Sequence, residues 1–202
     1  MDLLLQCWGG VFYLANKICF ALAETKPGGP QRQYRIAGWM VYLLGVPAWV
    51  TILVLKHDWI AASIEAGGVP AMLLGLTAAY HAGQEPNRFL DRLASAATYT
   101  FIVIGVGYSL FDYGGLTSLS QCLEIGVTIG FLLGSYLLAK GRASGWLLFM
   151  LMNACMGSLM MMQNKPILAL QQAASLCFVI FGCVSAARMK AAPGPVQPSA
   201  GN

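Results

Sequence analysis

Residues 145–188 read GWLLFMLMNACMGSLMMMQNKPILALQQAASLCFVIFGCVSAAR, and an earlier stretch of the chain echoes them without a gap. Both copies consist of two long apolar segments joined by a short polar turn, KHD at 56–58 and QNK at 163–165. One constant sequence separation, which we call the repeat offset, relates all matched positions: Gly38-Trp39 and Gly145-Trp146, Glu65-Ala66 and Gln172-Ala173, Gly75 and Gly182. A further apolar segment containing Gln-Cys precedes each copy. The pattern predicts a duplicated unit of three membrane-length segments, with one unmatched segment between the copies.

The composition is that of a membrane protein. Of the 202 residues, 57% are hydrophobic and 10% are charged, whereas a soluble domain carries about 25% charged residues. A helix that crosses the bilayer needs about 20 mostly apolar residues. Segments of this kind cover about 3–23, 37–55, 60–81, 93–111, 117–139, 144–162 and 167–187. We therefore expect an all-α polytopic membrane protein with seven transmembrane helices, arranged as two parallel three-helix repeats joined by a linking helix.

This interpretation divides the chain into four parts. Residues 1–82 form the first three-helix repeat, 83–115 the linking helix and its loops, and 116–188 the second repeat. Residues 189–202 are rich in Pro, Gly and Ala, and we expect them to form a disordered cytoplasmic tail.

The basic residues predict the orientation of the chain in the membrane. The loops after the first, third and fifth segments and the tail hold most of them: Lys26, Arg32, Arg35, Arg88, Arg92, Lys140, Arg142, Arg188 and Lys190. The opposite loops hold only Lys56 and Lys165. The positive-inside rule places the N-terminus outside and the C-terminus in the cytoplasm. Because the basic residues lie at segment ends, the net charge of +4 does not indicate nucleic-acid binding.

Two carboxylates lie in apolar segments. Glu65 is about a turn and a half into the third segment, where an ionisable group costs a few kcal/mol unless it faces protein or water. Glu124 belongs to a polar stripe of the fifth segment that begins at Gln121. Each carboxylate lies either on a solute pathway or merely at the membrane interface. Each is also able to carry a proton, so ion coupling is left open.

The second repeat adds aromatic and amide side chains to the candidate site. Trp146, Phe149 and Asn153 share one face of the sixth segment, and Trp39 and Gln172 occupy repeat-related places in the second and seventh segments. Asn153 lies about two turns inside, where an unpaired amide is costly. It therefore bonds to a neighbouring helix or faces a cavity.

The first segment carries polar side chains at helical spacing. Gln6, Tyr13 and Asn16 are spaced by seven and three residues, so they share one helix face. Lys17 is close to the cytoplasmic end of the segment, which favours a side chain that reaches the membrane surface over a buried functional lysine.

No catalytic motif is present in the sequence. It contains no phosphate loop, nucleophile elbow or metal-ligand spacing, and its two histidines lie at segment ends. We therefore expect neither an enzyme nor a cofactor or metal. Amides and carboxylates bind hydroxyl groups, and tryptophan faces take rings or cations, so the expected ligand is an uncharged or weakly cationic polar solute with a ring. Glu65 and Glu124 would repel an anion.

The second repeat resembles the PnuC family of vitamin transporters, whose best-known substrate is nicotinamide riboside. The resemblance rests on Leu-Leu-Ala-Lys at 137–140, on Trp146 followed by an aromatic residue and Asn153, and on a last helix with Gly182 and a basic exit. The residues themselves are similar over about 116–188, and the rest of the chain is similar only in its number of helices. PnuC proteins usually have a second Trp where Phe149 stands and a Tyr where Gln172 stands.

The resemblance implies facilitated diffusion by alternating access, trapping of the solute by a cytoplasmic kinase, and a place in a bacterial inner membrane. The SWEET sugar transporters share the 3+1+3 helix order, but they place a proline in the first helix of each unit, and the first and fifth segments here have none. A SWEET-like sugar transporter remains an alternative. So does a membrane scaffold or accessory subunit whose polar residues only join helices. Expected partners are a small solute and the lipid bilayer, with a possible homo-oligomer and no nucleic acid.

Overall fold

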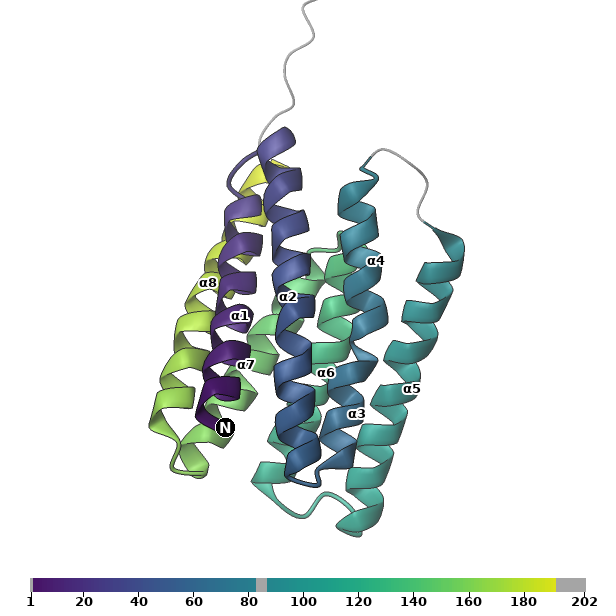
Figure 1. The fold of residues 1–202 in the computed structure, drawn as a ribbon, viewed down its shortest axis with the longest axis vertical. Coiled ribbons are helices and arrows are strands. Elements are labelled where there is room, and N and C mark those ends of the chain that lie inside the picture. Colours follow the sequence, from purple (N-terminus) through teal and green to yellow (C-terminus); the bar gives the residue numbers. More distant parts are fainter. Residues whose placement is uncertain (1, 83–86, 192–202) are drawn as a thin grey trace, which may run out of the picture.

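The protein is a bundle of roughly parallel helices (Figure 1). The computed structural model describes residues 2–82 and 87–191, and their regular secondary structure is helical throughout. The helices are α1 (Asp2–Ala23), α2 (Gly29–Leu55), α3 (Trp59–Gly67), α4 (Val69–Tyr80), α5 (Arg88–Asp112), α6 (Leu119–Ala139), α7 (Ser144–Met162) and α8 (Pro166–Ala191). Helices α3 and α4 follow one another along one line and together form a single interrupted rod (Figure 1).

Six stretches of the described chain are long and apolar enough to cross a membrane: Gly29–Leu55, Trp59–Tyr80, Arg88–Asp112, Leu119–Ala139, Ser144–Met162 and Pro166–Met189. They indicate an integral membrane protein. The first predicted segment is also a helix, α1, which packs against α2 and α8, but it is not among the six.

Two helices extend beyond the predicted segments. Helix α2 begins at Gly29 rather than near residue 37, with a proline in its first turn, where a missing N–H costs nothing. The guanidinium group of Arg32 donates to the carbonyl oxygens of Ala79 and Tyr80, so this polar extension caps the end of α4. Helix α8 continues to Ala191, so the first residues of the predicted tail are helical, and 192–202 lie outside the described residues.

The third predicted segment is interrupted between α3 and α4. Pro70 lacks an N–H, and its ring clashes with the carbonyl group four residues earlier. Gly68 ends α3, and its N–H bonds to the carbonyl oxygens of Glu65 and Ala66. The interruption therefore lies directly after the turn that carries Glu65.

The helices form a closed ring of contacts. Helix α1 contacts α2, α2 contacts α3 and α4, α4 contacts α6, α6 contacts α7, α7 contacts α8, and α8 contacts α1. Helix α5 lies outside this ring, where it packs on α3, α4 and α6 (Figure 1). We call α1–α4 the N-terminal helices and α6–α8 the C-terminal helices.

The turns after α2 and α7 share one backbone conformation. His57 and Asn164 are the two non-glycine residues with positive φ in the described chain, at 59° and 56°. In both turns the next N–H donates to the carbonyl oxygen five positions earlier, at 3.0 Å and 2.8 Å. This bond and a left-handed residue define the Schellman helix ending. The repeat offset relates these two residues as well.

A tryptophan packs on a glycine in each half of the bundle. Trp39 in α2 lies on Gly75 in α4, and a Cβ atom added to the glycine would be 2.2 Å from the ring. Trp146 in α7 lies on Gly182 in α8, where the corresponding distance is 2.5 Å. Both indole rings are buried, at 3% and 1% exposed. Only a residue without a side chain permits either approach.

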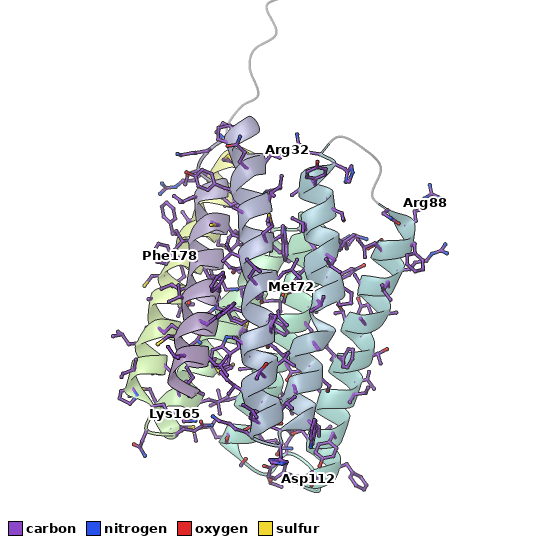
Figure 2. All side chains as sticks on the ribbon, in the orientation of Figure 1. Arg32, Met72, Arg88, Asp112, Lys165 and Phe178 are labelled. Atoms are coloured by element: carbon purple, nitrogen blue, oxygen red, sulfur yellow. The ribbon has the colours of Figure 1, made fainter. Side chains whose placement is uncertain are left out.

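The two ends of the bundle differ in charge. Arg32 and Arg88 lie at one end, which we call the basic end, and Asp112 and Lys165 lie at the opposite end (Figure 2). Ion pairs between described residues at the basic end join Arg35 to Glu24 at 2.9 Å and Lys140 to Asp91 at 2.8 Å. Hydrogen bonding to the Asp91 carboxylate raises the pKa of Lys140.

Candidate functional site

A cavity of about 950 Å³ lies inside the bundle and extends to the opposite end. It is lined by residues of every helix except α4, and it reaches from the turn residues Lys56 and Lys165 to Lys17 on α1. We call it the central cavity. Its volume is within the usual range for sites that hold small molecules.

Four of the predicted site residues line the central cavity together: Glu65, Glu124, Asn153 and Gln172. They come from α3, α6, α7 and α8, so both groups of helices contribute. Glu124 is exposed near the mouth and accepts a hydrogen bond from the Ser120 hydroxyl at 3.3 Å. The Asn153 amide donates to the carbonyl oxygen of Phe149, one turn earlier on the same helix, at 2.7 Å.

The two predicted tryptophans lie at a different site. Trp39 and Trp146 line a smaller pocket of about 340 Å³ at the basic end, together with Glu24, Arg35 and Arg142. They therefore do not share the cavity that holds Asn153 and Gln172.

A layer of fully buried side chains separates this pocket from the central cavity. Tyr42, Ser135, Phe149 and Val179, from α2, α6, α7 and α8, are each 0% exposed, and we call them the septum. The Tyr42 and Ser135 hydroxyl oxygens are 3.5 Å apart and link α2 to α6. Phe149, a predicted lining residue, lies in the septum. Asn153 and Trp146 are seven residues apart on α7, so the two hollows are separated by about 10 Å along the helix.

Gln121 lines neither hollow. Its Nε2 donates to the carbonyl oxygens of Ser109 and Gly115, at 3.0 and 2.9 Å, and its Oε1 accepts from the Thr117 N–H at 3.0 Å. The side chain is 1% exposed and holds the loop between α5 and α6. It is satisfied by the backbone rather than free to bind a solute.

Lys17 is buried, so the prediction that it reaches the membrane surface is wrong. Its side chain is 2% exposed and lines the central cavity. Its Nζ lies 3.8 Å from the centre of the Phe149 ring and 4.7 Å from that of Tyr42. Lys17 lies six residues before the end of α1, about 9 Å along the helix. The two rings attract its ammonium group toward the interior of the bundle.

The polar face of α1 is the sequence feature that predicts a position for Lys17 inside the cavity. Gln6, Tyr13 and Lys17 all line the central cavity, and their spacings of seven and four residues place them on one helix face. The sequence interpretation grouped Gln6 and Tyr13 with Asn16 instead. Asn16 donates to the carbonyl oxygen of Gly38 at 3.4 Å and joins α1 to α2.

The adjacent glutamines of α8 both line the central cavity. Gln171 also donates from Nε2 to the carbonyl oxygen of Gly10 at 3.1 Å, so it joins α8 to α1. Sequence reasoning selected Gln172 through the repeat and missed Gln171, and it missed Trp49, which lines the cavity from α2.

Buried polar atoms without a hydrogen-bond partner are concentrated around the central cavity. Eight described side chains contain such an atom, and six of them line the cavity: Tyr13, Lys17, Trp49, Glu65, Ser109 and Asn153. An unpartnered buried polar group costs about 1–3 kcal/mol, and more when it is charged. A polar solute with donors and acceptors would provide the missing partners.

Lys17 is one of two ionisable side chains in this set, and its Nζ has no hydrogen-bond partner. Burying an ion costs several kcal/mol unless it is paired. A cation over an aromatic ring gains about 0.5–2 kcal/mol. Contact with Phe149 and Tyr42 therefore offsets only part of the cost of this ammonium group.

No group of three or more His, Cys, Asp or Glu side chains that could hold a metal ion occurs within residues 2–82 and 87–191. The cavity instead offers ammonium, amide and carboxylate groups beside the aromatic rings of Tyr13, Trp49 and Phe131. Such a set can bind a polar solute that contains a ring. No protein-family model, no curated protein sequence and no solved structure matches this chain.

Proposed function

We propose that this protein is a membrane transporter for a small polar solute that contains a ring. The solute binds in the central cavity, between two three-helix repeats, and crosses by facilitated diffusion with alternating access. Nicotinamide riboside, or a related vitamin or nucleoside, is the first candidate because of the PnuC resemblance of the second repeat.

Several features support two repeats. Exchanging α1 with α6, α2 with α7, and the α3–α4 rod with α8 leaves the ring of helix contacts unchanged. The tryptophan–glycine contacts and the left-handed turn residues also recur with the repeat offset. In transporters built from repeats, the solute site lies at the repeat interface and is often formed by interrupted helices. The central cavity and the break after Glu65 fit this description.

The single observation that carries the proposal is the set of six side chains around the cavity that each contain a buried polar atom without a hydrogen-bond partner. In a scaffold, polar residues join helices by hydrogen bonds, as Gln121 and Gln171 do. Lys17, Glu65 and Asn153 instead keep a buried polar atom without a hydrogen-bond partner. Residues that only joined helices would be bonded to one another.

The septum supports alternating access. The central cavity reaches the opposite end of the bundle, while Tyr42 and Phe149 close it toward the basic end. By the positive-inside rule the basic end faces the cytoplasm. The structure then represents an outward-facing state, and transport requires the septum to open and the outer turns to approach each other.

A ligand screen on the purified chain tests the proposal. A solute that binds only the folded protein increases the free energy of unfolding by mass action and so raises the melting temperature. At a solute concentration of one hundred times the dissociation constant, the increase is about 2.7 kcal/mol. We expect a member of a panel of B-vitamins, nucleosides and sugars to raise the melting temperature, and to enter proteoliposomes that contain the protein. If no panel member binds or enters, the scaffold interpretation replaces this one. A response to sugars alone would favour the SWEET-like alternative.

Asn153→Leu and Gln172→Leu test the site itself. Each removes a hydrogen-bonding group from the cavity, so uptake should fall about 5- to 150-fold for a loss of about 1–3 kcal/mol. Val46→Leu is the matched control, since the repeat offset pairs Val46 with Asn153, and Val46 is 6% exposed and does not line the cavity. Unchanged uptake by folded Asn153→Leu protein would contradict the assignment.

A further inference from the structure

Two ionisable side chains lie in the interior of the central cavity, away from its mouth. Lys17 Nζ and Glu65 Oε1 are buried and have no hydrogen-bond partner. The other ionisable lining residues are exposed near the turns and carry both signs of charge: Lys56, Asp58, Asp112, Glu124 and Lys165. The selection of charge inside the cavity therefore depends on Lys17 and Glu65.

Aromatic rings connect the surroundings of Lys17 to the helix break that follows Glu65. Lys17 Nζ lies over the ring of Tyr42, and the Tyr42 and Phe131 ring centres are 6.2 Å apart. Phe131 lines the cavity and packs on Gly68, where an added Cβ would lie 2.7 Å from the ring. Gly68 is in the helix break that directly follows the turn of Glu65. Phe131 therefore lies near both the aromatic contacts of Lys17 and the helix break that follows Glu65.

Neither ionisable group can satisfy the other in this arrangement. Lys17 contacts ring faces, which attract a cation but accept no strong hydrogen bond. An ammonium group has three donors, and its natural partner is a carboxylate or phosphate oxygen. A carboxylate near Glu65 would be repelled, whereas a cationic or N–H group would be bound.

We propose that the transported solute is a zwitterion that contains a ring, with its carboxylate bound by Lys17 and its positively charged or N–H donor group facing Glu65. The ring of the solute then lies against Phe131. This inference rests on the proposed transport function and narrows its substrate class. Among the vitamins and nucleosides named above, it favours relatives that have a carboxylate over nicotinamide riboside itself, which has none. It also reverses the expectation that Glu65 and Glu124 exclude anionic groups, because that expectation did not place Lys17 in the cavity.

Matched pairs of solutes that differ in one group test this assignment. Nicotinic acid riboside and tryptophan are zwitterions, and nicotinamide riboside and tryptophan amide replace the carboxylate by a carboxamide. Binding is measured by calorimetry and thermal shift on the purified full chain. We expect the carboxylate member of a pair to bind at least about tenfold more tightly, as one added ion-pair hydrogen bond would produce.

Lys17→Met should abolish this preference while the remaining binding persists, and Lys17→Arg should retain it. Lys165→Met is the matched control, because it removes an exposed lysine at the mouth of the same cavity and should leave the preference unchanged. Glu65→Gln should weaken the binding of tryptophan more than the binding of N-acetyltryptophan, which is purely anionic.

The outcomes separate this inference from the transport proposal. Equal or tighter binding of the carboxamide members to the wild-type chain overturns the zwitterion assignment and leaves transport intact. Preference retained in Lys17→Met overturns the role of Lys17, and if that variant fails to fold, the wild-type preference and the Glu65→Gln comparison decide. The absence of any binding solute overturns both proposals.

Discussion

The N-terminal and C-terminal helices share several packing contacts but present different side chains to the cavity. Trp39 and Trp146 make the same contact with a glycine, and the turns at His57 and Asn164 have the same conformation. Toward the cavity the matched positions diverge: Glu65 corresponds to Gln172, and Asn153 to the apolar Val46. Packing positions therefore keep the two halves alike, while the site between them is asymmetric.

The septum lies where the two halves meet. Tyr42 and Phe149 are a further pair related by the repeat offset, and both rings contact Lys17 Nζ. Lys17 of α1 is the one cation over these two rings among the described residues, and α6 contributes the uncharged Ser135 to the septum. An asymmetric site of this kind suits a solute whose two ends differ in charge.

The largest expected effect concerns the buried tryptophans. Trp39→Ala and Trp146→Ala should each destabilise the protein by about 3–5 kcal/mol, because each leaves a cavity in the core. The melting temperature in detergent should fall to a similar extent in both variants. Trp59→Ala is the control, since Trp59 is 61% exposed and its loss should change stability little. A large loss in one variant and none in the other would contradict the equivalence of the two halves.

A smaller effect is expected from the glycines beneath these rings. Gly75→Ala and Gly182→Ala force the indole to shift, which costs about 1–3 kcal/mol in a packed core. Gly107→Ala provides the comparison, because nothing lies within 4 Å of its added Cβ and alanine favours the helix. Thermal unfolding of the three variants in one detergent measures the difference. Equal stability of all three would mean that the tryptophan–glycine contacts are not tight in solution.

The smallest effect is expected at the two left-handed turns. Glycine avoids the cost of about 1–2 kcal/mol that a side chain imposes at positive φ, but it loses about 0.5–1 kcal/mol more conformational entropy on folding. His57→Gly should therefore stabilise the protein by about 0.5–1 kcal/mol. Asn164→Gly should give less, because asparagine tolerates this conformation. Ala96→Gly, at an exposed helical position in α5, should instead destabilise by about 1 kcal/mol. Destabilisation by His57→Gly in a thermal scan would show that this turn differs in solution.

Hydropathy predicted most of the helices because the membrane imposes a length and an apolar composition on each span. The predicted range 144–162 coincides with α7, and 117–139 differs from α6 only at its start. Hydropathy did not predict the helix ends where polar residues continue a helix beyond its apolar part, as Gln31 and Arg32 do in α2. It also gave no sign that Gly68 and Pro70 divide the third segment into two helices.

The site was only partly predictable for a related reason. Repeat pairing and depth selected Glu65, Asn153 and Gln172, which do share the cavity. Depth alone cannot distinguish a side chain that faces a hollow from one that bonds to the backbone, and so Gln121 was included. Lys17 was misjudged because its distance from the end of the segment was considered without the helix face that it shares with Tyr13.

The position of α5 has a mechanical consequence. At the basic end Asp91 accepts hydrogen bonds from Tyr136 and Lys140, and at the opposite end Gln121 donates to the carbonyl oxygen of Ser109. These hydrogen bonds join both ends of α5 to α6 or to the residues beside it. The contact of α5 with α3 is instead apolar packing, such as that of Phe101 on Gly67. A rocking motion between the N-terminal and C-terminal helices would therefore carry α5 along with α6–α8. In such a motion, α5 would slide against α3 and α4, the two helices of the interrupted rod.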